Sequence, residues 1–343
     1  MNKPFFIIIL SLCLLLSGCK QMGSISKSNG ETKENTFEYG IVSTSFIKNE
    51  SRITLLSKSF DKREDIDIKY GGLQKGKKYG DNYFAPVVGT PNSMQNRIVK
   101  FNMESRKVSY IKTLSKPIDL EVEQKYLYVI HNSKINEGKV AKIDLKSNRI
   151  IKETSLKGVL KRIAFQGKKL VIASDNVKTQ KQVIYTLSDK LKTLNESKNE
   201  YTAFPTDILS SNDKLFLINN AKSDFSGPTD LILQYNDSSQ KIKPIRLSKN
   251  APWEMLKYKG SYFVTHYDFV TKHGRDITVL NSNEQSGKTY RLKNDPVRST
   301  IKDDHLFSID SKGIYEYDLK NLKLLSKGKV SIPDQPLIDF FIN

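Results

Sequence analysis

Four carboxylic acids occur at matching places in the chain, each shortly after a proline. They stand in the segments Pro-Ile-Asp119, Pro-Thr-Asp207, Pro-Trp-Glu254 and Pro-Leu-Ile-Asp339, and Pro-Val-Arg298 has a guanidinium at the same place. If these side chains converge, their oxygens suit a hard cation such as calcium, or the acids share protons at raised pKa values. The alternative is that they are polar residues lining a hydrated channel.

A second polar set lies four residues after a recurring apolar pair such as Leu127-Tyr128. Two of the four histidines occupy this place, and a metal or acid–base role would require them to lie near the acids. The alternative is that these residues end strands and bond to neighbouring loops. The set comprises His131, Ser174, Asn219, His266 and Asp310.

Long loops follow three of these positions, with the sequences HNSKINEGK, NNAKSDFSGPTD and HYDFVTKHGRD. They bring aromatic and arginine side chains, which are enriched in binding hot spots, towards one face. Ordinary loop packing is the alternative. Together with His131, Asn219, His266 and Asp310 of the second polar set, the expected binding face comprises Phe225, Trp253, Tyr267, Phe269 and Arg275.

Common catalytic motifs are absent from the sequence. It has no His-Glu-x-x-His, no Gly-x-Ser-x-Gly, no phosphate-binding glycine-rich loop and no EF-hand loop. No catalytic residue and no metal ligand is therefore assigned. No cofactor is expected, with calcium at the acids as the open alternative.

These residues recur because the chain repeats about every 44 residues. In several units a proline precedes an apolar pair by ten residues, as Pro117 precedes Leu127-Tyr128. Each unit continues with a second apolar segment such as Val140–Leu145, turn residues and a last strand-like segment. Four short β-rich segments per unit indicate the blade of a β-propeller.

Six complete units begin near residues 73, 117, 161, 205, 252 and 296. The segment 37–70 supplies three more strands, and the tail Pro336–Asn343 matches a first strand. Together they predict a seventh blade, in which the C-terminal strand closes the ring and removes exposed sheet edges. We therefore expect an all-β, seven-bladed β-propeller of four-stranded blades over residues 37–343. Six or eight blades, or a β-sandwich, are the alternatives.

One unit resembles a known family. YVIHN is close to Tyr-Val-Thr-Asn, and VAKIDLKSNRIIKET follows the pattern of the YVTN-repeat propellers, although the other units match poorly. The resemblance implies the propeller fold. Relatives of this architecture include lactonase-like sugar-acid enzymes, quinoprotein dehydrogenases and noncatalytic surface proteins, so the resemblance leaves the activity open.

The N-terminus predicts export and a lipid anchor. Lys3 precedes an apolar run, Phe5–Leu16, which is too short to span a bilayer and is typical of a signal peptide. Leu-Ser-Gly-Cys19 resembles the lipobox of bacterial lipoproteins, which implies a signal peptide over 1–18 and a diacylglycerol on Cys19. The polar segment 19–36 is then a flexible tether. An ordinary secreted protein is the alternative.

Charge and location suggest the partners. The formal net charge is +19, and a basic exported protein is drawn to anionic lipid headgroups, wall polymers or acidic polysaccharides. Lysine abundance from an AT-rich genome is the alternative reason for this charge. Nucleic acid is not expected as a partner outside the cytoplasm.

The resulting hypothesis is a monomeric lipoprotein of a Gram-positive bacterium, on the extracytoplasmic face of the cell membrane. Its propeller is expected to be a noncatalytic binding or scaffold module for an envelope protein or an anionic glycan. The alternative is a lactonase-like hydrolase, metal-dependent or not, with its site at the acidic channel mouth.

Overall fold

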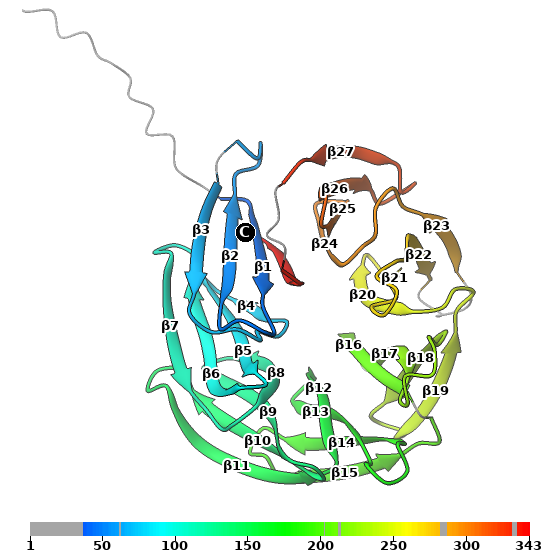
Figure 1. Cartoon of the computed structure of the whole chain (residues 1–343). Helices are drawn as coiled ribbons and strands as arrows, with labels where there is room; N and C mark the ends of the chain where they lie inside the picture. Colours follow the sequence, from blue (N-terminus) through cyan, green and yellow to red (C-terminus); the bar gives the residue numbers. More distant parts are fainter. Residues whose placement is uncertain (1–36, 62, 202, 212–213, 282–286, 331–334) are drawn as a thin grey trace, which may run out of the picture. The chain divides into compact units, whose positions relative to one another are not determined.

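The computed structural model describes residues 37–343, except 62, 202, 212–213, 282–286 and 331–334. The predicted signal peptide over 1–18 and the tether over 19–36, with Cys19, lie outside the described residues. In the described part, twenty-eight β-strands form seven four-stranded antiparallel sheets. Figure 1 shows these sheets arranged as blades around one axis in chain order. The predicted all-β, seven-bladed propeller is confirmed.

Blade 1 joins the first and last strands of the described chain. Its innermost strand is β28 (Leu337–Ile342), which pairs with β1 (Tyr39–Thr44). The strands β2 (Ser51–Leu56) and β3 (Arg63–Ile68) follow outwards. Because the C-terminal strand completes the first blade, the ring closes as predicted.

Blades 2 to 7 follow in chain order, each with its first strand next to the axis (Figure 1). Blade 2 is β4 (Lys77–Tyr79), β5 (Asn82–Thr90), β6 (Ser93–Asn102) and β7 (Lys107–Lys112). Blade 3 is β8 (Pro117–Glu123), β9 (Tyr126–Lys134), β10 (Glu137–Asp144) and β11 (Arg149–Lys157). Blade 4 is β12 (Val159–Gln166), β13 (Lys169–Asp175), β14 (Gln182–Ser188) and β15 (Thr193–Lys198).

The remaining three blades have the same order of strands. Blade 5 is β16 (Ala203–Ser211), β17 (Lys214–Lys222), β18 (Leu231–Asn236) and β19 (Lys241–Arg246). Blade 6 is β20 (Pro252–Tyr258), β21 (Ser261–His266), β22 (Asp276–Leu280) and β23 (Lys288–Arg291). Blade 7 is β24 (Arg298–Lys302), β25 (His305–Asp310), β26 (Gly313–Asp318) and β27 (Leu324–Gly328).

The apolar core is divided among seven clusters, one at each interface between neighbouring blades. At the interface of blades 3 and 4, for example, Tyr128 packs with Leu160 and Ile172. At the ring closure, Tyr39 and Phe340 of blade 1 pack with blade 7. Second strands contain a continuous apolar segment, such as Leu127–Ile130 in β9, because a neighbouring blade covers each of their faces there. The removal of these faces from water is the main stabilising contribution to the ring.

Blade 2 departs from the repeat at its entry. Its first strand β4 has only three residues and starts later than the repeat predicts. Leu73 instead forms an isolated bridge with Val87, and Gly72 before it has a φ of 73°, which favours glycine. The segment between this bridge and β4 carries Lys75, which enters the site described below.

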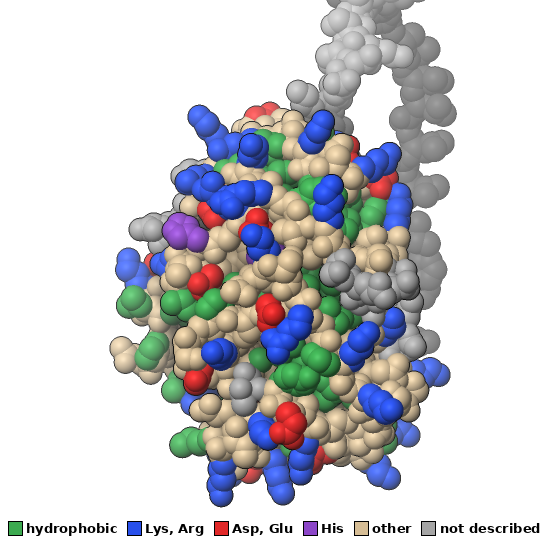
Figure 2. Space-filling view, turned by 90° about the vertical axis from the view of Figure 1, so that its right-hand side faces the viewer, with side chains coloured by type: hydrophobic (Ala, Val, Ile, Leu, Met, Phe, Trp, Pro, Cys, Tyr) green, Lys and Arg blue, Asp and Glu red, His purple; other side chains and the backbone are tan. Residues whose placement is uncertain are grey.

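The outer surface is rich in lysine. Figure 2 shows one side of the molecule, on which lysine and arginine side chains are spread widely with fewer acidic side chains between them. This distribution agrees with the formal net charge of +19.

Candidate functional site

The predicted acids lie on one ring around the channel. Each stands in the innermost strand of its blade, opposite an equivalent residue of the next strand. The same position is an arginine in blades 4 and 7. From blade 3 round to blade 1, the charged ring is Asp119, Arg162, Asp207, Glu254, Arg298 and Asp339.

A β-bulge precedes the charged ring in blade 1 and in blades 3 to 6. The register between the first two strands shifts there, which leaves one extra residue in each first strand. A bulge bends its strand and re-aims the neighbouring side chains. The extra residues are Ile338, Ile118, Lys161, Thr206 and Trp253, and all but Lys161 line the recess at the channel mouth.

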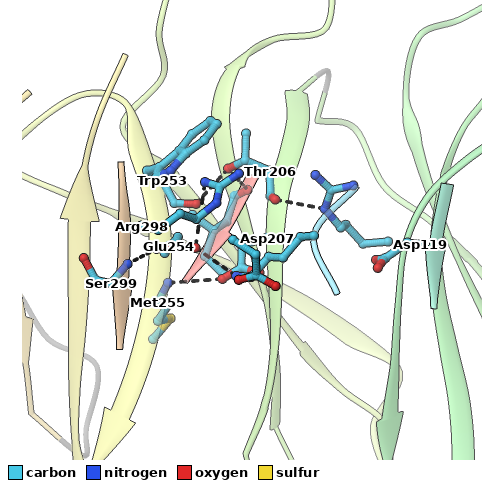
Figure 3. A network of polar contacts seen from close by, with 12 residues as sticks. Asp119, Thr206, Asp207, Trp253, Glu254, Met255, Arg298 and Ser299 are labelled. Carbon is cyan, nitrogen blue, oxygen red and sulfur yellow. Dashed lines mark hydrogen bonds and ion pairs between the residues drawn. The ribbon is translucent and has the colours of Figure 1, made fainter. Parts of the chain in front are cut away.

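Each carboxylate of the charged ring accepts a hydrogen bond from a backbone N–H of the following blade. Figure 3 shows two of these bonds, from Ser299 to Glu254 and from Met255 to Asp207. The N–O distances are 3.2 Å from Ile163 to Asp119, 3.4 Å from Met255 to Asp207, 2.8 Å from Ser299 to Glu254 and 2.9 Å from Gly76 to Asp339. The carboxylates therefore link blade to blade.

Lys75 neutralises the centre of the charged ring. Its Nζ lies 3.2 Å from Oδ1 of Asp207 and 2.9 Å from Oε1 of Glu254. Burial alone would lower the pKa of Lys75, but Asp207, Glu254 and Asp339 outweigh it and raise that pKa. The ammonium group is therefore charged throughout the physiological range.

The carboxyl group of Asp119 has a raised pKa. Burial raises the pKa, and the charges of Arg162 and Lys77 oppose that effect. Lys77 also forms an ion pair of 3.0 Å with Glu121. Both oxygens of Asp119 accept backbone hydrogen bonds, from Leu120 and Ile163.

The cationic side chains around the charged ring compete with the predicted calcium ion for the acids. Among the described residues, no three or more His, Cys, Asp or Glu side chains have an arrangement that could hold a metal ion. The four acids of the charged ring are matched by Lys75, Lys77 and the two ring arginines. A bound cation would have to compete with the ammonium group of Lys75 for Asp207 and Glu254.

Arg162 and Arg298 adopt the same pose three blades apart. The Nε of Arg162 donates to the Thr206 carbonyl at 2.9 Å, and that of Arg298 donates to the Ile338 carbonyl. In each arginine Nη1 donates to the carbonyl of the preceding residue. The Arg298 guanidinium also lies over the Trp253 ring, 4.9 Å from its centroid. Both guanidinium groups are thus held rigidly by neutral backbone oxygens.

A recess opens at the channel mouth, with about 580 Å³ of space including the solvent at its opening. Its charged lining consists of Lys75, Lys77, Asp119, Arg162, Asp207 and Arg298. Its apolar lining consists of Ile118, Ile208, Trp253 and Ile338. Cations, carboxylates and an aromatic ring thus line one small space.

An aromatic cluster continues from Trp253 over blades 5 and 6. It comprises Phe204, Phe225, Trp253, Tyr267 and Phe269. The ring centroids of Trp253 lie 5.5 Å from Tyr267 and 6.2 Å from Phe269, and those of Phe225 lie 5.2 Å from Phe204 and 6.3 Å from Phe269. Phe225 is 53% exposed. The four predicted aromatic residues therefore lie together, and Phe204 joins them.

The residues of the second polar set are buried, whereas residues of a binding face have to be accessible to a partner. His131, Asn219, His266 and Asp310 are all buried. Burial lowers the pKa of His131 to about 4 and also lowers that of His266, so both imidazoles are neutral at pH 7. His266 bonds through both ring nitrogens, to the Asn250 carbonyl and the Thr278 hydroxyl, each at 2.8 Å. With these hydrogen bonds, His266 is a polar residue at a strand end that bonds to neighbouring segments.

Arg275 lies on the surface and forms an ion pair of 3.6 Å with Asp295. Among the described residues, Arg275 makes no cation–π interaction with the rings of the aromatic cluster, whereas Arg298 does. Binding by any of the predicted residues stays a prediction.

Arg162, Phe204 and Lys75 are among the residues of the site that were not predicted from the sequence. Arg162 occupies the repeat position between Asp119 and Asp207, so the period alone could have located it. Phe204 directly precedes Pro205 and could have been found in the same way. Lys75 has no such signal, because it lies in the irregular entry to blade 2.

The fold defines the chain as a seven-bladed β-propeller, a class of protein that commonly serves as a binding scaffold. No protein-family model and no curated protein sequence matches it. Among solved structures it is similar to apo AztD from Citrobacter koseri, with 9% identity and a TM-score of 0.54 over 90% of this chain and 99% of that one.

Two further structures show the same fold. Hydrazine synthase from Kuenenia stuttgartiensis has 10% identity and a TM-score of 0.59 over 90% of this chain and 99% of that one. The computationally designed protein Ika8 has 9% identity and a TM-score of 0.58 over 84% and 87%. At these identities the likeness concerns the fold alone. Within the described residues, no helix has the length and apolar character of a transmembrane span.

Proposed function

We propose that this protein is a membrane-anchored extracytoplasmic lipoprotein whose propeller is a noncatalytic binding module for a protein or glycan partner. The observation that carries the proposal is the aromatic cluster, which runs from exposed Phe225 to Trp253 in the recess. Rigid aromatic side chains beside an arginine are the residue types that contribute most to binding. The resemblance of one blade to the YVTN-repeat family belongs to the same proposal.

Binding is favoured over catalysis because the carboxylates of the charged ring are already engaged. Glu254 accepts from Ser299 through one oxygen and contacts Lys75 through the other. Asp207 is held in the same way by Met255 and Lys75. The aromatic cluster, in contrast, includes an exposed ring at its outer end. Exposed apolar groups of this kind mark interaction sites.

The test is partner capture on intact cells. The full-length protein is crosslinked at the cell surface and compared with Phe225→Ser/Phe269→Ser. Leu325→Ser is the matched control, because Leu325 is equally exposed but lies on the outer strand of blade 7. The wild type and the control should capture the same partner, and the double variant should lose it. Equal capture by all three would contradict the proposal.

The membrane anchor is tested separately. The sequence Leu-Ser-Gly-Cys19 supports a lipid on Cys19. In Cys19→Ser the protein should no longer take up radiolabelled palmitate, and it should move from the membrane fraction to the medium. Unchanged lipid labelling in this variant would rule out Cys19 as the anchor.

A lactonase-like hydrolase is the second candidate function. The observation in its favour is the position of Asp119 in the recess, where burial raises the pKa of its carboxyl group. Against this function, both carboxylate oxygens of Asp119 already accept hydrogen bonds from backbone N–H groups. Lactone hydrolysis by the wild type that Asp119→Asn abolishes would favour the hydrolase over the binding module.

A further inference from the structure

The two arginines of the recess have donor capacity that the protein does not use. A guanidinium group carries five N–H donors in a planar fork. Arg162 and Arg298 each use Nε and one Nη1 hydrogen for backbone carbonyls. Among the described residues, no carboxylate forms an ion pair with Arg162, and Arg298 has only Glu254 at 3.9 Å. Rigid guanidinium groups with free donors favour a carboxylate or another oxyanion.

Acceptors lie in the same recess. Asp119 and Asp207 are part of its lining. Each oxygen accepts one bond within the protein and has a second lone pair. A ligand that presents only negative charge is repelled by these two acids. A ligand that carries hydroxyl groups beside one carboxylate can donate to the acids and accept from the arginines.

The aromatic cluster adds a third requirement. Trp253 lines the recess, and the other rings continue from it in steps of 5.2 to 6.3 Å between centroids to the exposed Phe225. A pyranose ring has a C–H face with a slight positive charge, which packs against the negative face of an aromatic ring. Because the cluster extends beyond the recess, it suits a ligand of several sugar units.

We propose that the recess and the aromatic cluster bind an acidic oligosaccharide whose sugar units carry carboxylate groups, such as a uronic acid polymer. Arg162 and Arg298 each bind a carboxylate of the ligand, Asp119 and Asp207 accept hydroxyl groups, and the aromatic rings contact neighbouring sugar units. This inference rests on the proposed binding function and specifies its partner. An acidic peptide is the less favoured ligand because its carboxylates leave Asp119 and Asp207 without hydroxyl donors.

The experiment measures binding of the full-length protein in detergent to four probes. These are oligogalacturonate, its methyl ester, poly(glycerol phosphate) and poly-glutamate. Oligogalacturonate should bind at least tenfold more tightly than each of the other three. Arg162→Gln should weaken its binding at least tenfold. Arg149→Gln removes the same charge from an exposed position on the outer strand β11, and it should change the binding less than twofold.

Phe225→Ser keeps the test valid if Arg162→Gln does not fold. Phe225 is exposed, so its replacement should leave the propeller intact. The variant should weaken binding of long oligogalacturonates and leave binding of a single galacturonate unchanged. Equal affinity for the methyl ester, equal affinity for the other polyanions, or no binding of oligogalacturonate would overturn the proposal. The binding function itself would still stand if partner capture on cells depended on the aromatic cluster.

Discussion

The ammonium group of Lys75 lies 2.9 Å from Oε1 of Glu254, although the two residues belong to opposite parts of the ring, the entry to blade 2 and the first strand of blade 6. This ion pair spans the channel. Glu254 is only 3% exposed at its side chain, and it also binds the backbone of blade 7 through Ser299. The contact therefore connects three blades at the axis.

Replacing Lys75 should destabilise the propeller. Lys75→Met leaves the buried carboxylate of Glu254 without its nearest cation. Breaking a fully buried pair costs about 3–5 kcal/mol. We expect about 2 kcal/mol here because the Lys75 side chain is 37% exposed and solvent weakens the pair. Urea unfolding at pH 7 measures the loss.

Lys259→Met is the control for this substitution. Lys259 pairs with Asp304 on the surface, where both side chains are well exposed. An exposed pair of this kind contributes little to stability, because water screens its charges. The double variant Lys75→Met/Glu254→Gln should recover part of the stability, because it removes the uncompensated charge. A loss no larger than that of the control would show that the ion pair across the channel has no stabilising role.

Ring closure depends on Phe341 in the C-terminal strand. Its ring stacks on Tyr83 of blade 2 with centroids 5.0 Å apart, and it packs directly against Gly40 of β1. Phe341→Ala should lower the free energy of unfolding by about 3–5 kcal/mol through loss of burial and formation of a cavity. Denaturant unfolding followed by circular dichroism measures this change. Phe225→Ala, at an exposed position, should change it by less than about 0.5 kcal/mol.

The fold could be predicted from the sequence because every blade contains the same local pattern of strands. Continuous apolar second strands such as Leu127–Ile130 are needed wherever two blades cover one strand, so the same pattern recurs in every unit. The tail matched a first strand for the same reason. Position within the repeat also placed the acids of the charged ring correctly relative to one another.

The burial of polar side chains, and the residues that they contact, could not be predicted in the same way. His131 and His266 were aligned correctly, but nothing in their spacing reveals that neighbouring blades exclude them from solvent. The contact of Lys75 with Glu254 joins residues that are 179 positions apart, and it arises where blade 2 departs from the repeat. Interactions between blades depend on the curvature of the ring, which no single unit contains.

Calcium should not stabilise the protein measurably. Lys75 already contacts Asp207 and Glu254, and the ring arginines balance the other acids. Binding to the folded state alone at a hundredfold excess over Kd would add about 2.7 kcal/mol. Thermal unfolding with calcium and with chelator should therefore give the same midpoint at constant ionic strength. A higher midpoint with calcium that Asp207→Asn/Glu254→Gln abolishes would establish a metal site.

Asp175 should make stability depend on pH near 6. It lies at the end of β13, 8% exposed, and pairs with Lys161 at 3.3 Å. Burial raises its pKa to about 6, and Lys161 only partly opposes this effect. The folded protein therefore binds a proton more readily than the unfolded chain between pH 4 and pH 6. This favours folding at low pH, and the advantage is lost as the pH rises through 6.

Comparison with Asp175→Asn isolates this carboxyl group, because asparagine has similar shape and does not titrate. Relative to the variant, the wild type should gain up to about 3 kcal/mol as the pH falls from 7.5 to 4, since one pKa unit corresponds to about 1.4 kcal/mol. Urea unfolding of both proteins across this range measures the difference. The same comparison with Asp144→Asn should show no such gain in this range, because hydrogen bonds from Ser147 and Lys146 lower the pKa of exposed Asp144 and its contribution changes only at lower pH. A wild-type advantage over Asp175→Asn that stays constant with pH would mean that Asp175 titrates as it does in the unfolded chain, with Lys161 fully compensating its burial.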